Sequence, residues 1–184
     1  ALPQLFLAGV IDKSGKFNKT LEHPRLRFSG DQYEYVIAWA HETSIGQDVV
    51  VCQDDIRAIQ LGKSAMYAGS RILMETLGIE KVDKVILAGA FGSYIDKISA
   101  AVLGMFPDCD PKNVYSVGNA AGDGARMALL NVDKRREADE YARKVEYIEL
   151  TLSPKFEKMF AHSMWIPHMK DAFPNLQEFL PPKK

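Results

Sequence analysis

The hydrophobic positions along the chain switch repeatedly between helical and strand-like spacing, and this alternation predicts an α/β fold. The expected helices have apolar residues at three- and four-residue steps, or a run of charged residues without glycine or proline. They cover 54–77, 95–103, 118–131, 134–144 and 154–164. Short apolar and β-prone runs mark the expected strands, which cover 33–40, 48–52, 82–88, 114–117 and 147–150. The first two strands are expected to form a hairpin around 42–47.

The two ends of the chain have patterns of their own. Helically spaced apolar residues lead from the first residue to Gly9, which is placed to terminate a helix. Neither a starting Met nor a capping residue precedes that helix, so we expect the chain to be a fragment of a longer protein. Residues 10–32 are turn-rich and are expected to be irregular. Residues 167–184 are proline-rich and are expected to form a surface strap or linker, which leaves 1–166 as the domain.

Composition narrows the class of protein without locating a site. A chain of 184 residues, 47% hydrophobic and 26% charged, fits a soluble globular domain and not a disordered segment. The formal net charge of −1 gives no electrostatic reason to expect nucleic acid or an anionic membrane as a partner. Apolar runs are too short to span a bilayer and no signal peptide is present, so the cytoplasm is the expected compartment.

The cysteines and histidines do not form a metal-binding or catalytic pattern. Cys52 and Cys109 lie far apart and outside any C-x-x-C pair, so two free thiols are expected, with one disulfide as the alternative. The four histidines lack the spacing of metal ligands, and no metal site is expected. No Ser/His/Asp or Cys/His arrangement can be argued, so we assign no catalytic residue.

One triplet resembles part of a phosphate-binding loop. Gly62-Lys63-Ser64 matches the end of a P-loop, but the glycine required five residues earlier is replaced by Arg57. The triplet also lies inside an expected helix, whose backbone N–H groups are already used. We therefore reject a P-loop and interpret Gly62, Ala65 and Gly69 as a small-residue helix face that lets another element approach closely.

A stronger signal follows the expected strand at 82–88. Its apolar second half is typical of strands covered on both faces, and it ends in Gly89-Ala90-Phe91-Gly92. Ligands of open α/β sheets bind beyond the carboxyl ends of strands, where glycines let the backbone approach a flat ligand. The alternative is a tight strand–helix turn without a ligand. A Rossmann fingerprint is not met, because the third glycine is missing.

A second glycine-rich segment, Gly118-Asn119-Ala120-Ala121-Gly122-Asp123-Gly124, begins an expected helix. Glycine in a helix costs about 0.5–1 kcal/mol relative to alanine, so several glycines there need a compensating reason. The two alternatives are close helix–helix packing and approach of the backbone to a ligand.

These two segments resemble motifs of the actin, hexokinase and heat-shock-chaperone ATPase superfamily. Residues 81–93 resemble its adenosine motif, in which a glycine-ended strand packs against the nucleotide's adenosine. Residues 118–125 resemble its second connecting motif, where small-residue helices of two lobes cross. The resemblance implies a ribonuclease-H-like, actin-like ATPase lobe with a mixed sheet flanked by helices.

Longer segments resemble one family within that superfamily, the iron–sulfur reductive activators of corrinoid proteins. The similar segments are LFLAGVIDKSG (5–15), DIRAIQLGKSAMYAG (55–69), ILAGAFGSYID (86–96), VGNAAGDGARMALL (117–130), VEYIEL (145–150) and MWIPH (164–168). The resemblance implies that the chain is the C-terminal region of such an activator. In this family, ATP hydrolysis is coupled to the electron transfer that returns Co(II) corrinoid to Co(I) for methyl transfer in one-carbon metabolism.

The resemblance also implies a nucleotide site shared with a second lobe. The residues expected on its adenosine side are Gly89, Ala90, Phe91 and Gly92. Gln60 and Lys63 are expected to face the base or ribose. The residues expected at the inter-lobe contact are Gly118, Asn119 and Gly122. The implied cofactors are ATP with Mg, and an iron–sulfur cluster in the full-length protein only.

The chain also departs from the family pattern. The acidic phosphate motifs and the cluster cysteines are absent from it, so we expect the fragment alone to lack the ATP-hydrolysing activase activity of the full-length protein. The implied partner is the corrinoid protein of a methyltransferase system. The alternative is a non-catalytic module that docks this partner, or a second copy in a homodimer; Met164-Trp165 and the proline-rich tail would serve this role if they are exposed. An independent nucleotide-binding enzyme would need a complete phosphate site.

Overall fold

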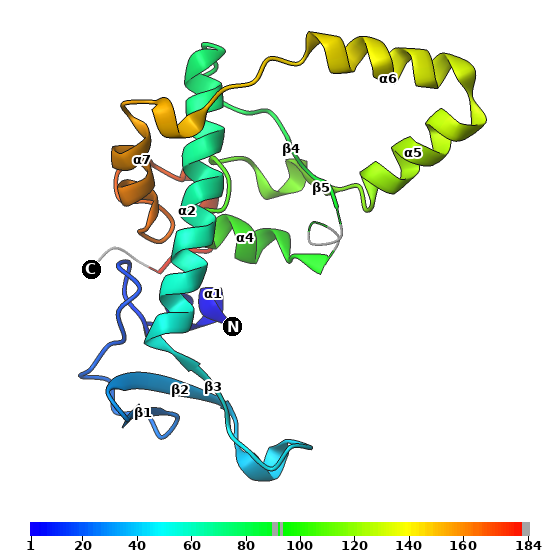
Figure 1. Cartoon of the computed structure of the whole chain (residues 1–184). Helices are drawn as coiled ribbons and strands as arrows, with labels where there is room; N and C mark the ends of the chain where they lie inside the picture. Colours follow the sequence, from blue (N-terminus) through cyan, green and yellow to red (C-terminus); the bar gives the residue numbers. More distant parts are fainter. Residues whose placement is uncertain (90–91, 93, 182–184) are drawn as a thin grey trace.

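A single long helix, α2 (Gln53–Thr76), organises the computed structural model, which describes residues 1–89, 92 and 94–181. A three-stranded sheet lies at one end of α2, and two parallel strands lie along one side of it (Figure 1). Helix α7 (Phe156–Ser163) packs along the other side. The arrangement is α/β, as the hydrophobic pattern predicted.

The three-stranded sheet is antiparallel, in the order β1-β2-β3. Its strands are β1 (Leu26–Ser29), β2 (Gln32–Ala38) and β3 (Val49–Cys52). The predicted hairpin between β2 and β3 is confirmed. Strand β1 was missed, because most of its side chains are exposed and it lacks the apolar alternation that marks a half-buried strand. Residues 10–32 are therefore not irregular throughout.

Helix α2 begins and ends at local signals. The backbone N–H of Cys52, the N-cap residue, donates to the Asp55 carboxylate at 2.9 Å, which completes a capping box. Gly78 follows the last turn with a φ of 67°, a conformation that glycine adopts readily.

The second sheet contains β4 (Val85–Leu87) and β5 (Val114–Ser116), which pair in parallel. Helix α4 (Lys97–Leu103) connects them, and Val85 lies opposite Val114. Ile86, in the middle of β4, is 58% exposed. The expectation that this strand is covered on both faces is therefore wrong for this chain: one face packs on the core and the other is open.

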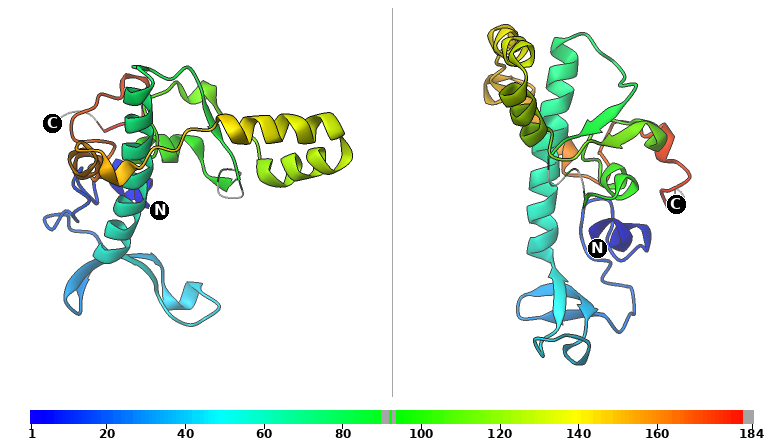
Figure 2. Two further views of the ribbon diagram at one scale, coloured as in Figure 1. Left: turned by 45° about the horizontal axis from the view of Figure 1, so that its top comes forward. Right: turned by 90° about the vertical axis from the view of Figure 1, so that its right-hand side faces the viewer.

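Two helices form an arm that projects from the body, α5 (Ala120–Leu130) and α6 (Val132–Lys144) (Figures 1 and 2). They contact one another, and nearly all their side chains are exposed. The strand expected at 147–150 is not formed; a 3₁₀ turn at Leu150–Leu152 follows an extended segment instead. A strand needs a neighbour for its backbone groups, and this segment runs alone between the arm and α7.

The core consists of two clusters between α2, α4 and the chain ends. The first includes residues of α1 (Leu2–Leu7) and Ile166, and the second includes Phe173 and Leu176. The expectation that the tail after residue 166 is a surface strap or linker is therefore wrong for Phe173 and Leu176, whose apolar side chains fill the core. The division of the chain at 166 stays a prediction.

Among the helices that the structure describes, none combines the length and apolar character needed to cross a membrane.

Candidate functional site: two glycine turns at one sheet edge

The fold brings the two glycine-rich segments together. Both follow parallel strands, and the backbone N–H of Gly89 donates to the carbonyl of Gly118 at 2.6 Å. The two residues have φ angles of 94° and 69°, which glycine adopts without strain. Apart from its chain neighbours, no atom of the described residues lies within 4 Å of the place where a Cβ of Gly89 would stand, so there is space beside this residue. Ala90 and Phe91 lie outside the described residues.

Gly92 is required by close packing. Its carbonyl accepts a hydrogen bond of 2.7 Å from the Ser116 hydroxyl, which ties the turn after β4 to the end of β5. A Cβ on Gly92 would lie 2.9 Å from the Leu87 carbonyl carbon, closer than side chains tolerate. The tight-turn explanation therefore accounts for Gly92, whereas Gly89 faces open space.

Asn119 and Gly122 form the start of α5. The Asn119 carboxamide oxygen accepts from the Gly122 backbone N–H at 3.1 Å and caps the helix. A Cβ on Gly122 would lie 2.6 Å from the Asn119 carboxamide nitrogen, so glycine permits this cap. Gly89, Gly92, Gly118, Asn119 and Gly122 thus share one edge, at the carboxyl ends of adjacent parallel strands.

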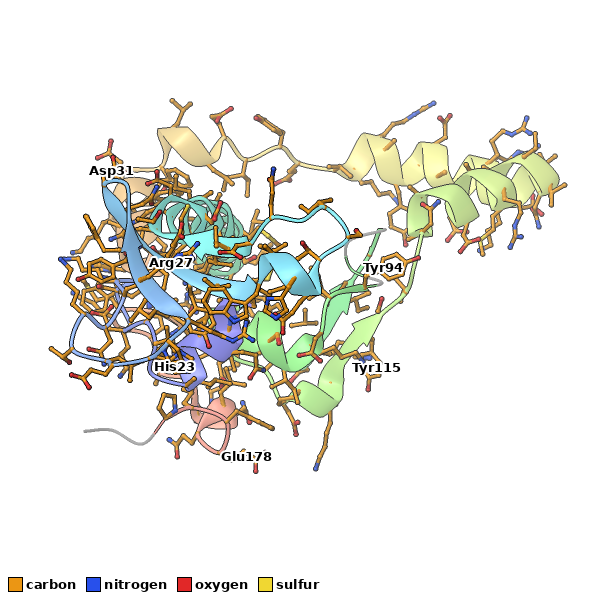
Figure 3. The ribbon with its side chains drawn as sticks, turned by 90° about the horizontal axis from the view of Figure 1, so that it is seen from below. His23, Arg27, Asp31, Tyr94, Tyr115 and Glu178 are labelled. Carbon is orange, nitrogen blue, oxygen red and sulfur yellow. The ribbon has the colours of Figure 1, made fainter. Side chains whose placement is uncertain are left out.

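The sequence did not single out Tyr94, which follows the first turn and is 91% exposed. Figure 3 places its side chain beside the end of the β4–β5 sheet. A lone tyrosine carries no motif, so spacing alone could not identify it. Its ring provides an exposed aromatic face near the end of this sheet.

Gln60 and Lys63 do not join this edge. Both are almost completely buried, at 1% and 3% exposure, and they bind the chain's own backbone. The Gln60 carboxamide donates to the carbonyls of Ser14 and Met164 at 3.0 and 2.6 Å. The Lys63 ammonium donates to the carbonyls of Trp165 and Pro167, the latter at 2.7 Å.

Burial lowers the pKa of Lys63 to about 7. The pKa falls because desolvation disfavours the charged form of the side chain. Gln60 and Lys63 therefore hold the C-terminal segment against α2, and the expectation that they face a base or ribose does not fit their surroundings. The same contacts keep Met164 and Trp165 half-buried, which removes the basis for a docking role of that pair.

Further along α2, the Tyr67 hydroxyl donates to the Asp171 carboxylate at 2.7 Å. The Tyr67 ring stacks on His168 with centroids 4.8 Å apart. Burial lowers the pKa of His168 to about 4, although the Asp171 carboxylate opposes the shift. This buried polar cluster was not predicted, because its members are about a hundred residues apart in sequence.

Comparisons with known proteins identify the family. Residues 1–177 match the family model of the C-terminal domain of RACo, the ASKHA domain. The chain belongs to this family. It is the C-terminal region of reductive activators of corrinoid proteins, as the sequence motifs predicted, and the family is associated with corrinoid reductive activation.

Three similar proteins show how much of a longer protein this region represents. The chain is 38% identical over 169 residues to the corrinoid activation enzyme RamQ of Eubacterium limosum, covering 87% of this chain and 28% of that protein. A solved structure of a reductive activator for corrinoid, iron–sulfur protein matches with a TM-score of 0.83 and 37% identity, covering 92% and 27%. A mitochondrial NADPH:adrenodoxin oxidoreductase of Drosophila melanogaster is 33% identical over 132 residues, covering 68% and 25%. The chain thus spans about a quarter of the length of its relatives.

Proposed function

We propose that this chain is the nucleotide-binding lobe of an ATP-dependent activator that returns Co(II) corrinoid protein to Co(I) for methyl transfer. The observation that carries the proposal is the hydrogen bond between Gly89 and Gly118, which joins the two glycine turns. Open α/β sheets bind ligands at this edge, beyond the carboxyl ends of their strands. Gly89, Ala90, Phe91 and Gly92 would then line the adenosine side of the site.

The exposed groups at this edge suit a flat, partly apolar ligand. The open backbone at Gly89 permits close approach, and the ring of Tyr94 can stack on a base. ATP with Mg would supply the free energy for the uphill electron transfer, at a site shared with the second lobe. This chain's residues would bind and orient the adenosine. The iron–sulfur cluster belongs to the remainder of the full-length activator.

The arm gives a specific reason to expect a second lobe. Its exposed apolar side chains include Met127, Leu129, Leu130 and Val132, and the open face of β4 adds Ile86. Helices with apolar faces and parallel sheets are normally covered by other elements. We assign this surface to the lobe that completes the nucleotide site, with Gly118, Asn119 and Gly122 at the contact. On this proposal the chain alone does not hydrolyse ATP.

The alternative function is a docking or dimerisation module for the corrinoid partner in the cytoplasm. The exposed apolar arm also favours this alternative, because such a surface is typical of an interface. The two functions differ in their need for nucleotide: the activator requires ATP, whereas a docking module binds its partner without it.

Reduction of the corrinoid in the full-length protein tests the proposal. With a low-potential electron donor and ATP, the absorbance of Co(I) should rise while the Co(II) signal in electron paramagnetic resonance disappears. Gly89→Val places a side chain in the space proposed for adenosine and should slow this conversion at least about a hundredfold. Gly62→Val, at an exposed position on α2 away from the glycine turns and the arm, provides the control, since among the described residues nothing lies within 4 Å of the added Cβ. Equal rates with and without ATP would refute the activator function.

A further inference from the structure

A pocket of about 330 Å³ lies between the start of α2 and the β1–β2 hairpin, at the end of the molecule away from the arm. Aromatic side chains form its apolar walls. Phe28 meets Tyr33 edge-on with ring centroids 5.2 Å apart, and Phe17 is buried beside them. Phe28 is nevertheless 61% exposed, so a large apolar surface borders the pocket.

The rim of the pocket is predominantly cationic. Lys16, Lys19 and Arg57 line it, and the opposing carboxylate is Asp31, near the tip of the hairpin in Figure 3. The Lys19 ammonium lies 5.4 Å from the centre of the Tyr33 ring. Within the described part of the chain, none of these three cations forms an ion pair. The rim therefore carries a local excess of positive charge on a chain whose net charge is −1.

The pocket is held in shape before any partner binds. The Arg57 guanidinium donates to the Ser14 carbonyl at 3.1 Å and to the Gln60 carboxamide oxygen at 2.8 Å. The Gln53 carboxamide donates to the Gly15 carbonyl at 2.8 Å. The loop bearing Lys16 is closed by the Asp12 carboxylate, which accepts from the backbone N–H groups of Ser14 and Lys16. Preorganised walls lower the entropic cost of binding.

We propose that this aromatic–cationic pocket, lined by Lys16, Phe17, Lys19, Phe28, Tyr33 and Arg57, docks an acidic segment of a partner protein. One apolar side chain of that segment enters between the aromatic walls, and flanking carboxylates meet the cationic rim. A phosphate ion or another small anion would leave the aromatic walls uncovered. Charge complementarity of this kind speeds association and selects partners.

The probe is the blocked pentapeptide Glu-Asp-Phe-Asp-Glu, titrated into the ¹⁵N-labelled chain and followed by NMR. Saturable shift changes should be confined to the pocket and should weaken as added salt screens the charges. The double variant Lys16→Glu/Lys19→Glu should weaken binding at least about tenfold. Asp31→Asn removes the opposing carboxylate and should strengthen it. Lys158→Glu, an exposed position on α7, is the control and should leave it unchanged.

Three results would overturn the proposal. A peptide with serine in place of its phenylalanine could bind equally well, which would show that the aromatic walls are not used. Inorganic phosphate could displace the peptide as effectively as an excess of unlabelled peptide, which would indicate a simple anion site. The pocket resonances could remain unchanged throughout the titration, while thermal melts confirm that every variant is folded.

Discussion

Where α2 meets the C-terminal segment, polar and apolar groups are both buried, whereas the α5–α6 arm exposes nearly all of its side chains. Lys63 and Tyr67 reach partners about a hundred residues away. In the arm, the ion pairs join residues three or four positions apart on the same helix. The first region is stabilised by tertiary structure within the chain, and the second has only local support. This difference locates the surface that a second lobe would cover.

The largest expected difference in the free energy of unfolding comes from replacing one glycine by alanine in each region. Gly104 ends α4 with a φ of 72°, and its Cβ would lie 2.1 Å from the Pro167 carbonyl oxygen. Gly104→Ala should therefore lower the free energy of unfolding by about 3 kcal/mol or more. Gly124→Ala, in the open arm, should instead raise it by about 0.5–1 kcal/mol because alanine favours helix. Urea denaturation measures the free energy of unfolding of both variants. Equal changes would contradict the claim that the first region is closely packed and the arm is open.

The buried region should also be the more sensitive to acid. The pKa of His168 is about 4 in the folded chain and about 6.5 when unfolded, so the unfolded state binds more protons between these values. The contribution of neutral His168 to the free energy of unfolding is therefore fully present above pH 6.5 and is lost as the pH falls towards 4. Thermal melts across this range should fall more steeply for the native chain than for His168→Gln. Parallel curves would contradict this assignment.

The smallest effect is expected at Leu130, which is 78% exposed in the arm. Leu130→Ser should change the stability of this chain by no more than about 0.5 kcal/mol. In a protein extended to include the second lobe, the same substitution should cost about 2 kcal/mol, because the side chain would then be buried. Differential scanning calorimetry on both proteins measures the contrast. A small effect in both would show that Leu130 stays exposed in the longer protein.

The sequence predicted elements wherever local spacing decides structure. Helix α2, the β2–β3 hairpin and the two glycine turns follow from apolar periodicity and from glycine after a strand. The sequence-based prediction failed where contacts between residues distant in sequence determine the structure. The burial of Phe173 depends on the fit of the tail against α2 and α4, and nothing in a proline-rich tail shows that fit.

The candidate site shows the same division. Gly89 and Gly118 were identified from their positions after two strands, and their hydrogen bond needed only the pairing of β4 with β5. Gln60 and Lys63 were placed at the nucleotide because they lie on the preceding helix. Which way a helical side chain points is fixed by tertiary packing, and here it points to the C-terminal segment.

Calorimetric titration of ATP with Mg into two proteins tests the shared nucleotide site most directly. The first protein is this chain and the second extends it upstream through the complementary lobe. The account predicts that the extended protein binds ATP, that Gly89→Val in it abolishes binding, and that this chain alone binds at least about a hundredfold more weakly. Equal affinity of the two proteins would contradict a shared site. Unchanged binding by the extended Gly89→Val protein would contradict the role of the glycine turns.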